Sequence, residues 1–236
     1  MPCSMKVSIS LGGSLLTGKN NYKPLELNPE TYKRYAGVLR KLHEEDHELM
    51  VVCGGGRPAR HFIEIAKNLG ATRYVQDMLG VKATHVNALL MMAALGEAAD
   101  QSRVYQRASD LANRAHRKIL VGGGYKPGSS TDYRAVIFAG KMGADLIVNA
   151  SDVDGVYDHD PHTNPEAKKL SNLTFSELER IIKSNTVQSP GEYRLFDLKA
   201  VRLAAKLEIP IVFIDGRDPE EIKRAVHMQH HGSIVQ

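Results

Sequence analysis

The segment Leu49-Met50-Val51-Val52-Cys53-Gly54-Gly55-Gly56 carries the pattern from which the fold class is best predicted. The apolar run is typical of a buried strand, and the glycines allow the chain to turn immediately after it. The pattern occurs twice more: residues 6–11 run into Gly12-Gly13, and residues 118–121 run into Gly122-Gly123-Gly124. Repeated strands that end in glycine turns indicate an α/β fold with a parallel sheet.

Strand-like and helix-like segments alternate along the whole chain. Further strands are expected at 145–149 and 209–214. Helices are expected from Asn28-Pro29, with Asn as N-cap, at 58–69, 81–99, 131–141 and 197–207, after a capping box of Thr174 and Glu177, and from Asp218-Pro219. No linker or repeat interrupts this order. We therefore expect one domain over residues 1–236, a three-layer αβα sandwich with a largely parallel central sheet.

Composition excludes several classes of protein. Of the 236 residues, 42% are hydrophobic and 25% are charged, which excludes a disordered chain. Cys3 and Cys53 are the only cysteines, so a reducing, cytoplasmic setting is expected rather than a disulfide framework. The sequence has no run of about 18 apolar residues and no long apolar leader, so we expect neither a membrane span nor export.

The charge balance favours small anionic ligands. The net charge is +4, and the 31 Lys and Arg residues are dispersed rather than clustered. With no Trp and only 6% aromatic residues, the chain offers no evident stacking platform for single-stranded nucleic acid. We therefore expect phosphorylated small molecules as partners and no nucleic acid.

The three glycine turns carry the first functional signal. In open parallel sheets, ligands bind beyond the carboxyl ends of the strands. Glycine at these ends lets backbone N–H groups and helix N-termini approach phosphate oxygens closely. A tight turn would explain any one of them, but three at equivalent places favour a ligand with more than one phosphate. The P-loop pattern and a helix-opening Gly-x-Gly-x-x-Gly are absent, which excludes those two nucleotide-binding classes.

Five motifs, in this order and spacing, resemble the amino acid kinase family. They include Gly12-Gly13-Ser14, the stretch 52–60 (Val-Cys-Gly-Gly-Gly-Arg-Pro-Ala-Arg) and Gly128-Ser129-Ser130-Thr131-Asp132. The stretch 151–161 (Ser-Asp-Val-Asp-Gly-Val-Tyr-Asp-His-Asp-Pro) is similar to the nucleotide-site signature of that family. Within the family, Gln76-Asp77-Met78-Leu79-Gly80, Arg60 and Asp197-Leu198-Lys199-Ala200 resemble the archaeal type of uridylate kinase.

The resemblance implies transfer of the γ-phosphoryl group of ATP, with Mg²⁺, to UMP in pyrimidine nucleotide biosynthesis, by a homohexamer. The residues that it places at ATP are Gly13, Ser14, Gly56, Arg60, Ser151, Asp152, Tyr157 and Asp160. Those that it places at UMP are Gly55, Asp77, Tyr125, Lys126, Pro127, Gly128, Ser129, Ser130 and Thr131. Catalytic roles fall to Arg60, Thr131, Asp132 and Asp197, and no resident metal site is expected.

Physical chemistry agrees with several of these roles. The acceptor is already a phosphate anion, so catalysis reduces to aligning two polyanions and neutralising charge. The Arg60 guanidinium could grip phosphate oxygens bidentately, or it could be a solvated helix residue. Asp77 could accept hydrogen bonds from both ribose hydroxyls, or it could cap a helix before Met78.

Other residues leave two interpretations open. Thr131 and Asp197 could be helix caps, or they could face the transferring phosphoryl group and organise its cations. Tyr157 could pack on adenine or only on its own loop. His227, with His230 and His231, could bind a metal, but a solvated tail is the simpler interpretation because no carboxylate or Cys ligand set accompanies these histidines in the sequence.

One position departs from the family pattern. Many members carry a Lys two residues before the first glycine pair, where this chain has Ser10. The catalytic cation is therefore unassigned, with Arg60, Lys126 and Lys199 as candidates. Two other functions remain open: an isopentenyl phosphate kinase, which His61 would suit, and a non-catalytic relative that binds nucleotides or oxyanions.

Overall fold

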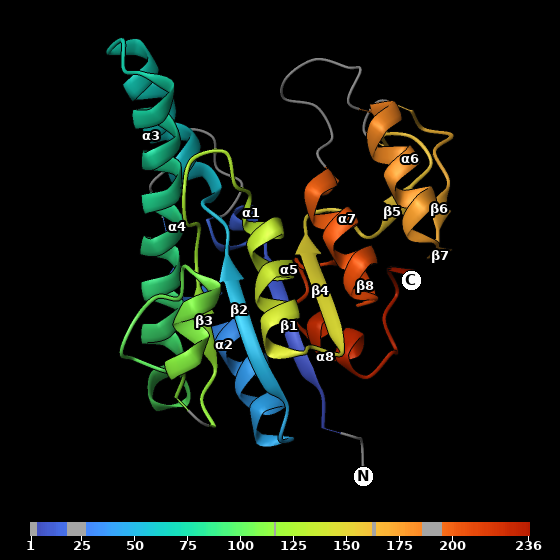
Figure 1. Ribbon diagram of the computed structural model, residues 1–236, viewed down its shortest axis with the longest axis horizontal. Helices are drawn as coiled ribbons and strands as arrows, with labels where there is room; N and C mark the ends of the chain where they lie inside the picture. The colour runs from blue at the N-terminus through green and yellow to red at the C-terminus, as the bar shows by residue number, and fades with distance from the viewer. Residues whose placement is uncertain (1–3, 18–26, 116, 162–163, 186–194) are drawn as a thin grey trace.

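The structure is a computed structural model that describes residues 4–17, 27–115, 117–161, 164–185 and 195–236; Cys3 lies outside them. A seven-stranded sheet has the order β3-β2-β1-β4-β8-β9-β7 (Figure 1). Its strands are β1 (Lys6–Leu11), β2 (Glu48–Cys53), β3 (Leu120–Gly122), β4 (Leu146–Ser151), β7 (Asn172–Leu173), β8 (Ile211–Asp215) and β9 (Ser233–Val235). A separate pair is formed by β5 (Val156–Tyr157) and β6 (Lys169–Leu170).

The helices lie between these strands along the chain. They are α1 (Gly13–Leu16), α2 (Pro29–Glu44), α3 (Gly56–Asn68), α4 (Arg73–Leu95), α5 (Thr131–Met142), α6 (Phe175–Asn185), α7 (Leu198–Leu207) and α8 (Glu220–Val226), with 3₁₀ turns at Gly96–Ala98 and Ala108–Asn113. Figure 1 shows α3 and α4 at one side of the sheet and α6 with β5 and β6 at the other. The predicted alternation of strands and helices is confirmed.

The sheet is largely parallel, as predicted. On β1, Ile9 is opposite Val51 of β2 on one side and Val148 of β4 on the other. Beyond them, β3 continues parallel to β2 and β8 continues parallel to β4. The exception is β9, which runs antiparallel to β8. Because parallel strands end at the same edge, the turns that follow β1, β2 and β4 come together there (Figure 1).

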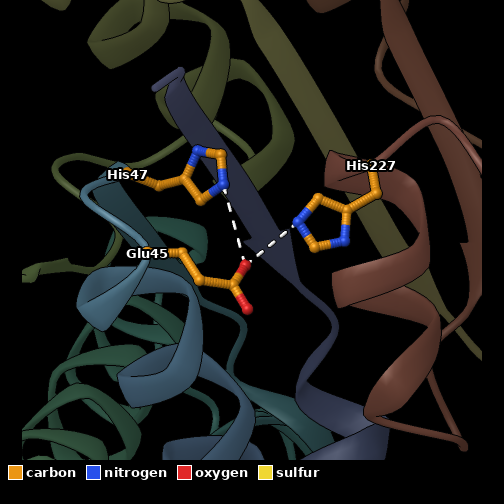
Figure 2. A group of neighbouring side chains, drawn as sticks. All are labelled: Glu45, His47 and His227. Atoms are coloured by element: carbon orange, nitrogen blue, oxygen red, sulfur yellow. Dashed lines mark ion pairs between the residues drawn. The ribbon is translucent and has the colours of Figure 1, made fainter. Parts of the chain in front are cut away.

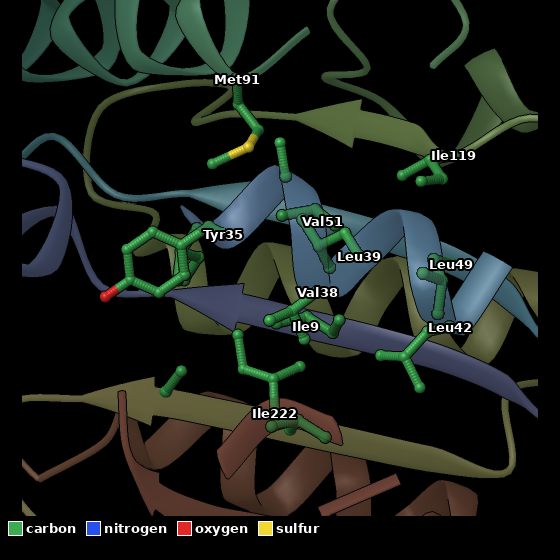
Figure 3. Close-up of a cluster of buried hydrophobic side chains, with 14 of the residues drawn as sticks. Ile9, Tyr35, Val38, Leu39, Leu42, Leu49, Val51, Met91, Ile119 and Ile222 are labelled. Atoms are coloured by element: carbon green, nitrogen blue, oxygen red, sulfur yellow. The ribbon is translucent and has the colours of Figure 1, made fainter. Parts of the chain in front are cut away.

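Alternate strand residues face two helical layers, which confirms the three-layer architecture. On one face, Ile9 and Val51 pack against Leu39 of α2, Met91 of α4 and Ile222 of α8 (Figure 3). The opposite face packs against α5, α6 and α7. Full burial of each such aliphatic side chain contributes roughly 1.5–3 kcal/mol, so packing on both faces stabilises the sheet.

Local capping chemistry explains where several helices begin. Asn28 caps α2, since its side chain accepts a hydrogen bond from Glu30 N at 3.0 Å. The predicted capping box is present: Thr174 Oγ1 accepts from Glu177 N at 3.2 Å, and Glu177 Oε2 accepts from Thr174 N at 2.8 Å. Both predictions are confirmed.

Other predicted boundaries are wrong. The long helix α4 begins at Arg73 rather than near residue 81, because Thr72 Oγ1 accepts from Val75 N and starts the helix two turns earlier. Its first turns carry polar and bulky residues that hide the helical period. Shorter shifts occur at α3, β3, β8 and α8, which begin at Gly56, Leu120, Ile211 and Glu220.

Within the described residues, the segment Arg73–Ala98 is the one helical stretch long and apolar enough to satisfy the length and composition of a membrane span. In the structure, 44% of its most apolar window is buried inside the protein. Ala88, Met91 and Leu95 lie in the core beside β1 and β2. Packing against the core therefore explains part of its apolar character.

Candidate active site

The first glycine turn lies directly against the second. A Cβ atom on Gly13 would lie 2.1 Å from the backbone nitrogen of Gly56, so no larger residue fits there without movement of the backbone. Gly56 has a φ of +63°, a conformation that favours glycine. Gly54 N donates to Leu11 O at 2.8 Å, which joins the two turns beyond the ends of β1 and β2. We call this contact of residues 12–13 with 54–56 the glycine junction.

A cavity of about 230 Å³ lies beside the glycine junction. It brings together three residues predicted at ATP, which are Ser14, Arg60 and Asp152. It also contains residues that the sequence analysis missed: Thr31, Arg34, Tyr35, Arg57 and Arg217. The signal for these was weak because Arg34 and Tyr35 lie on α2, whose pattern shows only an amphipathic helix, and Arg217 follows the distant strand β8.

The lining of this cavity is strongly basic. Arg217 is neutralised by Asp215, with 2.6 Å between Nη2 and Oδ2. Arg34, Arg57 and Arg60 make no ion pair with any other described residue, while Asp152 is the acidic group in the lining. Unpaired guanidinium groups beside backbone N–H groups form a site that suits phosphate oxygens.

Asp132 lies in the first turn of α5, where its side chain contacts the neighbouring strands β1 and β4. Its Oδ1 accepts from Ser10 Oγ at 2.7 Å and from Asn149 Nδ2 at 3.3 Å. Burial, with a smaller contribution from the negative charge of Asp197, raises the pKa of Asp132 to about 6. At the position where the family resemblance leads us to expect Lys, Ser10 donates a hydrogen bond from its hydroxyl group to this carboxylate.

Asp197 and Ser130 link two helix N-termini at this site. Asp197 caps α7 by accepting from Lys199 N at 2.8 Å, and it also accepts from Ser130 Oγ at 2.6 Å. Ser130, not Thr131, caps α5, since Ser130 Oγ accepts from Tyr133 N at 3.0 Å. The cap interpretation of Thr131 is therefore wrong, whereas that of Asp197 is confirmed without excluding its other role.

The third glycine turn is fixed by α4. Gly124 N donates to Thr84 Oγ1 at 2.7 Å, and the His85 Nε2 atom lies 2.7 Å from Gly124 O. Burial lowers the pKa of His85, so the neutral ring donates this hydrogen bond. Thr84 and His85 were missed because neither stands out within an apolar helix.

The predicted acceptor loop continues from this turn. Arg107 and Arg134 both lie over the Tyr125 ring, with their guanidinium carbons 5.1 and 5.3 Å from its centroid. Lys126 O accepts from Ser129 N at 3.3 Å, which closes a turn around Pro127 and Gly128. These contacts position Tyr125 and the turn that leads into α5. Its residues do not line the arginine-rich cavity.

Asp77 lies inside α4, where it pairs with Arg73 at 3.2 Å. Thr72 is the cap of this helix, so the alternative interpretation of Asp77 as a cap is wrong. The Asp77 side chain is half-buried and is one helical turn from Gly80. It is not part of the cavity lining.

The nucleotide-signature segment follows β4. Ser151 is the last residue of β4, and its backbone oxygen accepts from Gly216 N at 2.7 Å. Tyr157 donates to Asp154 Oδ1 at 2.8 Å, so its hydroxyl is held by its own loop. Asp160 is buried, and its backbone oxygen accepts from Asn164 N at 2.9 Å.

A second cluster lies at the opposite edge of the sheet, where α2 leads into β2. Figure 2 shows Glu45, His47 and His227 facing one another. The Nε2 atoms of His227 and His47 lie 3.0 and 4.0 Å from the same Glu45 oxygen. A carboxylate thus accompanies a C-terminal histidine, contrary to our expectation, because Glu45 is distant in sequence but adjacent in the fold. His231 likewise pairs with Glu221 at 2.7 Å.

The protonation of His47 bears on what this cluster can bind. Met5 N donates to His47 Nδ1 at 3.1 Å, which leaves the proton of the neutral ring on Nε2. Burial and the nearby His227 lower the pKa of His47, in keeping with a neutral ring. Its Nε2–H therefore points at a carboxylate, and a metal there would require loss of that proton and of the Met5 contact.

Comparison with known proteins identifies relatives along almost the whole chain. Residues 5–215 match the amino acid kinase family. The uridylate kinase of Hyperthermus butylicus is 38% identical over 89% of this chain and 93% of its own length. That of Methanobrevibacter smithii is 34% identical over 98% of this chain and 99% of its own.

Solved structures agree. The crystal structure of uridylate kinase from Archaeoglobus fulgidus superposes with a TM-score of 0.83 at 30% identity, over 98% of this chain and 100% of that one. UMP kinase from Ureaplasma parvum, at 22% identity, shares the fold with a TM-score of 0.80 over 99% of both chains.

Proposed function

The chain belongs to the amino acid kinase family, and we propose that it transfers the γ-phosphoryl group of ATP to UMP, giving UDP for pyrimidine nucleotide synthesis. The observation that carries this proposal is the glycine junction, which lies beside a cavity lined by Arg34, Arg57 and Arg60, none of which pairs with an acidic group among the described residues. The names of the archaeal relatives support the choice of UMP as acceptor.

On the ATP side, we propose that the backbone of Gly13, Ser14 and Gly56 donates to the phosphates and that Arg60 binds the same oxygens. The adenosine pocket would be formed by Ser151, Asp152, Tyr157 and Asp160. ATP arrives as its Mg²⁺ complex, so the metal enters with the substrate and spreads the charge of the β- and γ-phosphates.

On the acceptor side, we propose that Gly55, Asp77 and the loop 125–131 bind UMP. The support is their common position along α4 and the third glycine turn, which Thr84 and His85 hold in place. In this division of a single domain over residues 1–236, the N-terminal part binds the acceptor and the C-terminal part binds ATP.

The proposed reaction needs no general base, because the UMP phosphate is already a nucleophilic anion. Its rate depends on bringing two polyanions into line and on neutralising the charge between them. Thr131, at the N-terminus of α5, would face the transferring group. Asp132 and Asp197 would hold the ends of β1, α5 and α7 in register through Ser10 and Ser130.

The experiment that tests this function is a panel of acceptors. ADP release from ATP and Mg²⁺ is measured with UMP, CMP, isopentenyl phosphate and carbamate, each with and without excess chelator. We expect magnesium-dependent turnover with UMP that exceeds turnover with the other acceptors. Preference for isopentenyl phosphate, or no turnover with any acceptor, would replace the proposal by one of its two alternatives.

We also propose that the chain assembles with copies of itself. The helices α3 and α4 expose a group of apolar side chains, which are Ile65, Leu69, Tyr74, Val75, Val86, Leu89 and Leu90. Leu69 is 80% exposed. Contact with a second copy would cover this surface, and repetition of such contacts would build the hexamer that the family resemblance implies.

A further inference from the structure

We propose that Arg57 is a catalytic residue, whose guanidinium binds the γ-phosphoryl group of ATP during its transfer. The proposal rests on the proposed function only in requiring ATP as the phosphoryl donor. Nothing in it depends on which phosphate or other group accepts the phosphoryl.

Arg57 is tied to the glycine junction through Thr17. Its backbone N–H donates to Thr17 Oγ1 at 3.3 Å, and Thr17 Oγ1 donates in turn to Gly13 O at 2.9 Å. Gly56, with its φ of +63°, directs the chain from the junction into the first turn of α3. The base of the Arg57 side chain is therefore fixed next to the backbone that we place at the ATP phosphates.

The Arg57 side chain has an unsatisfied donor. Its Nη1 atom is buried and has no hydrogen-bond partner among the described residues, although the side chain lines the arginine-rich cavity. A buried donor of a charged group without a partner is unfavourable, and an anionic oxygen in the cavity would satisfy it with a charge-assisted hydrogen bond. The need of Nη1 for a hydrogen-bond acceptor distinguishes Arg57 from an arginine that only packs against its neighbours.

The other cations around the cavity suit this role less well. Arg217 is held by hydrogen bonds to both oxygens of Asp215. Arg34 and Arg60 are exposed, whereas Arg57 is half-buried, where its charge is screened less by water. On the neighbouring strand, Ser10 donates to Asp132 and supplies no positive charge. Arg57, which directly follows Gly56, is thus a half-buried cation next to the junction that pairs with no acidic group among the described residues.

A role on the γ-phosphate predicts a specific pattern of affinities. ADP lacks that phosphate, while the non-hydrolysable analogue AMP-PNP retains a group in its place. We therefore compare wild type, Arg57→Ala and Arg57→Lys by calorimetric titration with both nucleotides and Mg²⁺, and measure kcat with ATP. Arg180→Ala, which removes an exposed arginine on α6, serves as the matched control.

We expect Arg57→Ala to weaken AMP-PNP binding about tenfold or more while ADP binding changes less than about threefold. The kcat should fall about 100-fold, be partly restored in Arg57→Lys, and rise again when free guanidinium is added to Arg57→Ala. Equal weakening of ADP and AMP-PNP, or no effect on either with unchanged kcat, would overturn the proposal. Because these titrations contain no acceptor, they remain decisive even if UMP proves not to be the substrate.

Discussion

Asp132 lies in the candidate active site, where burial and the nearby charge of Asp197 disfavour its ionised form. Burial raises the pKa of its carboxyl group to about 6, against about 3.9 in an unfolded chain. A group whose pKa is raised on folding stabilises the folded state at low pH, and that contribution is lost as the pH rises from about 4 through 6. Around neutral pH, an ionised Asp132 therefore costs the fold stability.

Removal of this charge gives the first prediction. Asp132→Asn should raise the free energy of unfolding at pH 7.5 by about 1–2 kcal/mol, which is less than the full pKa shift implies because Asp132 keeps some contact with water. The same substitution should abolish most activity. Urea denaturation at pH 5 and pH 7.5 measures the free energy of unfolding: the gain should be larger at pH 7.5. An identical difference between variant and wild type at both pH values would show that Asp132 ionises normally.

Asp77 gives the second prediction at the scale of single residues. Hydrogen bonds to an ionised carboxylate are worth about 1.5–3 kcal/mol, so Asp77→Asn should weaken UMP binding about 10- to 100-fold and leave ATP affinity within about twofold. Wild type should also discriminate against 2′-deoxy-UMP more strongly than the variant does. Normal UMP binding, or loss of ATP binding instead, would limit Asp77 to its ion pair with Arg73.

Site residues that lie in a motif could be predicted from the sequence, but site residues that are close only in the folded structure could not. Gly13, Ser14, Arg60 and Asp152 lie in marked motifs, and the structure brings them to one place. Arg34 and Arg217 reach the same cavity from α2 and from the end of β8, and no local pattern links these segments. The Glu45–His227 contact was missed for the same reason. Spatial neighbours that are far apart in sequence need the topology before they can be recognised.

Among the elements, the glycine junction sets how closely β1 and β2 can end together. Gly13→Ala would force a Cβ to within 2.1 Å of the Gly56 nitrogen, so we expect it to lower the free energy of unfolding by about 2 kcal/mol or more and to reduce nucleotide binding severely. Gly37→Ala in α2, where nothing lies within 4 Å, is the matched control.

That control should stabilise the protein by about 0.5–1 kcal/mol, because Ala favours the helix, and should leave activity unchanged. Thermal and urea denaturation of both variants provide the measurement. If Gly13→Ala behaved like Gly37→Ala, the close approach of the two turns would have no importance for the site.

Element types were predicted well because hydrophobic period and capping residues are local. Asn28 and the pair Thr174 and Glu177 marked true helix starts. The start of α4 was missed because a single Thr72 cap precedes residues without a clear apolar stripe. The antiparallel strand β9 and the short pair of β5 and β6 were not predicted, because they depend on pairing between distant segments and have no local sequence pattern.

For the whole molecule, the exposed apolar side chains of α3 and α4 predict self-association. Wild type should sediment as a species several times heavier than the 26.0 kDa chain. The double variant Val86→Glu, Leu89→Glu should shift it towards the monomer, whereas Met228→Glu, an exposed apolar residue elsewhere, should not. A monomeric wild type, or a double variant that assembles normally, would remove these helices from any interface.

The proposed reaction is direct transfer of a phosphoryl group from ATP to UMP at the glycine junction. The most direct measurement follows radiolabel from γ-³²P-ATP when the protein, Mg²⁺ and UMP are incubated together and the products are separated. The label should appear as the β-phosphate of UDP, in a one-to-one ratio with ADP. Label recovered as inorganic phosphate, or left on ATP while the folded protein is present, would show that the protein does not transfer the phosphoryl group to UMP.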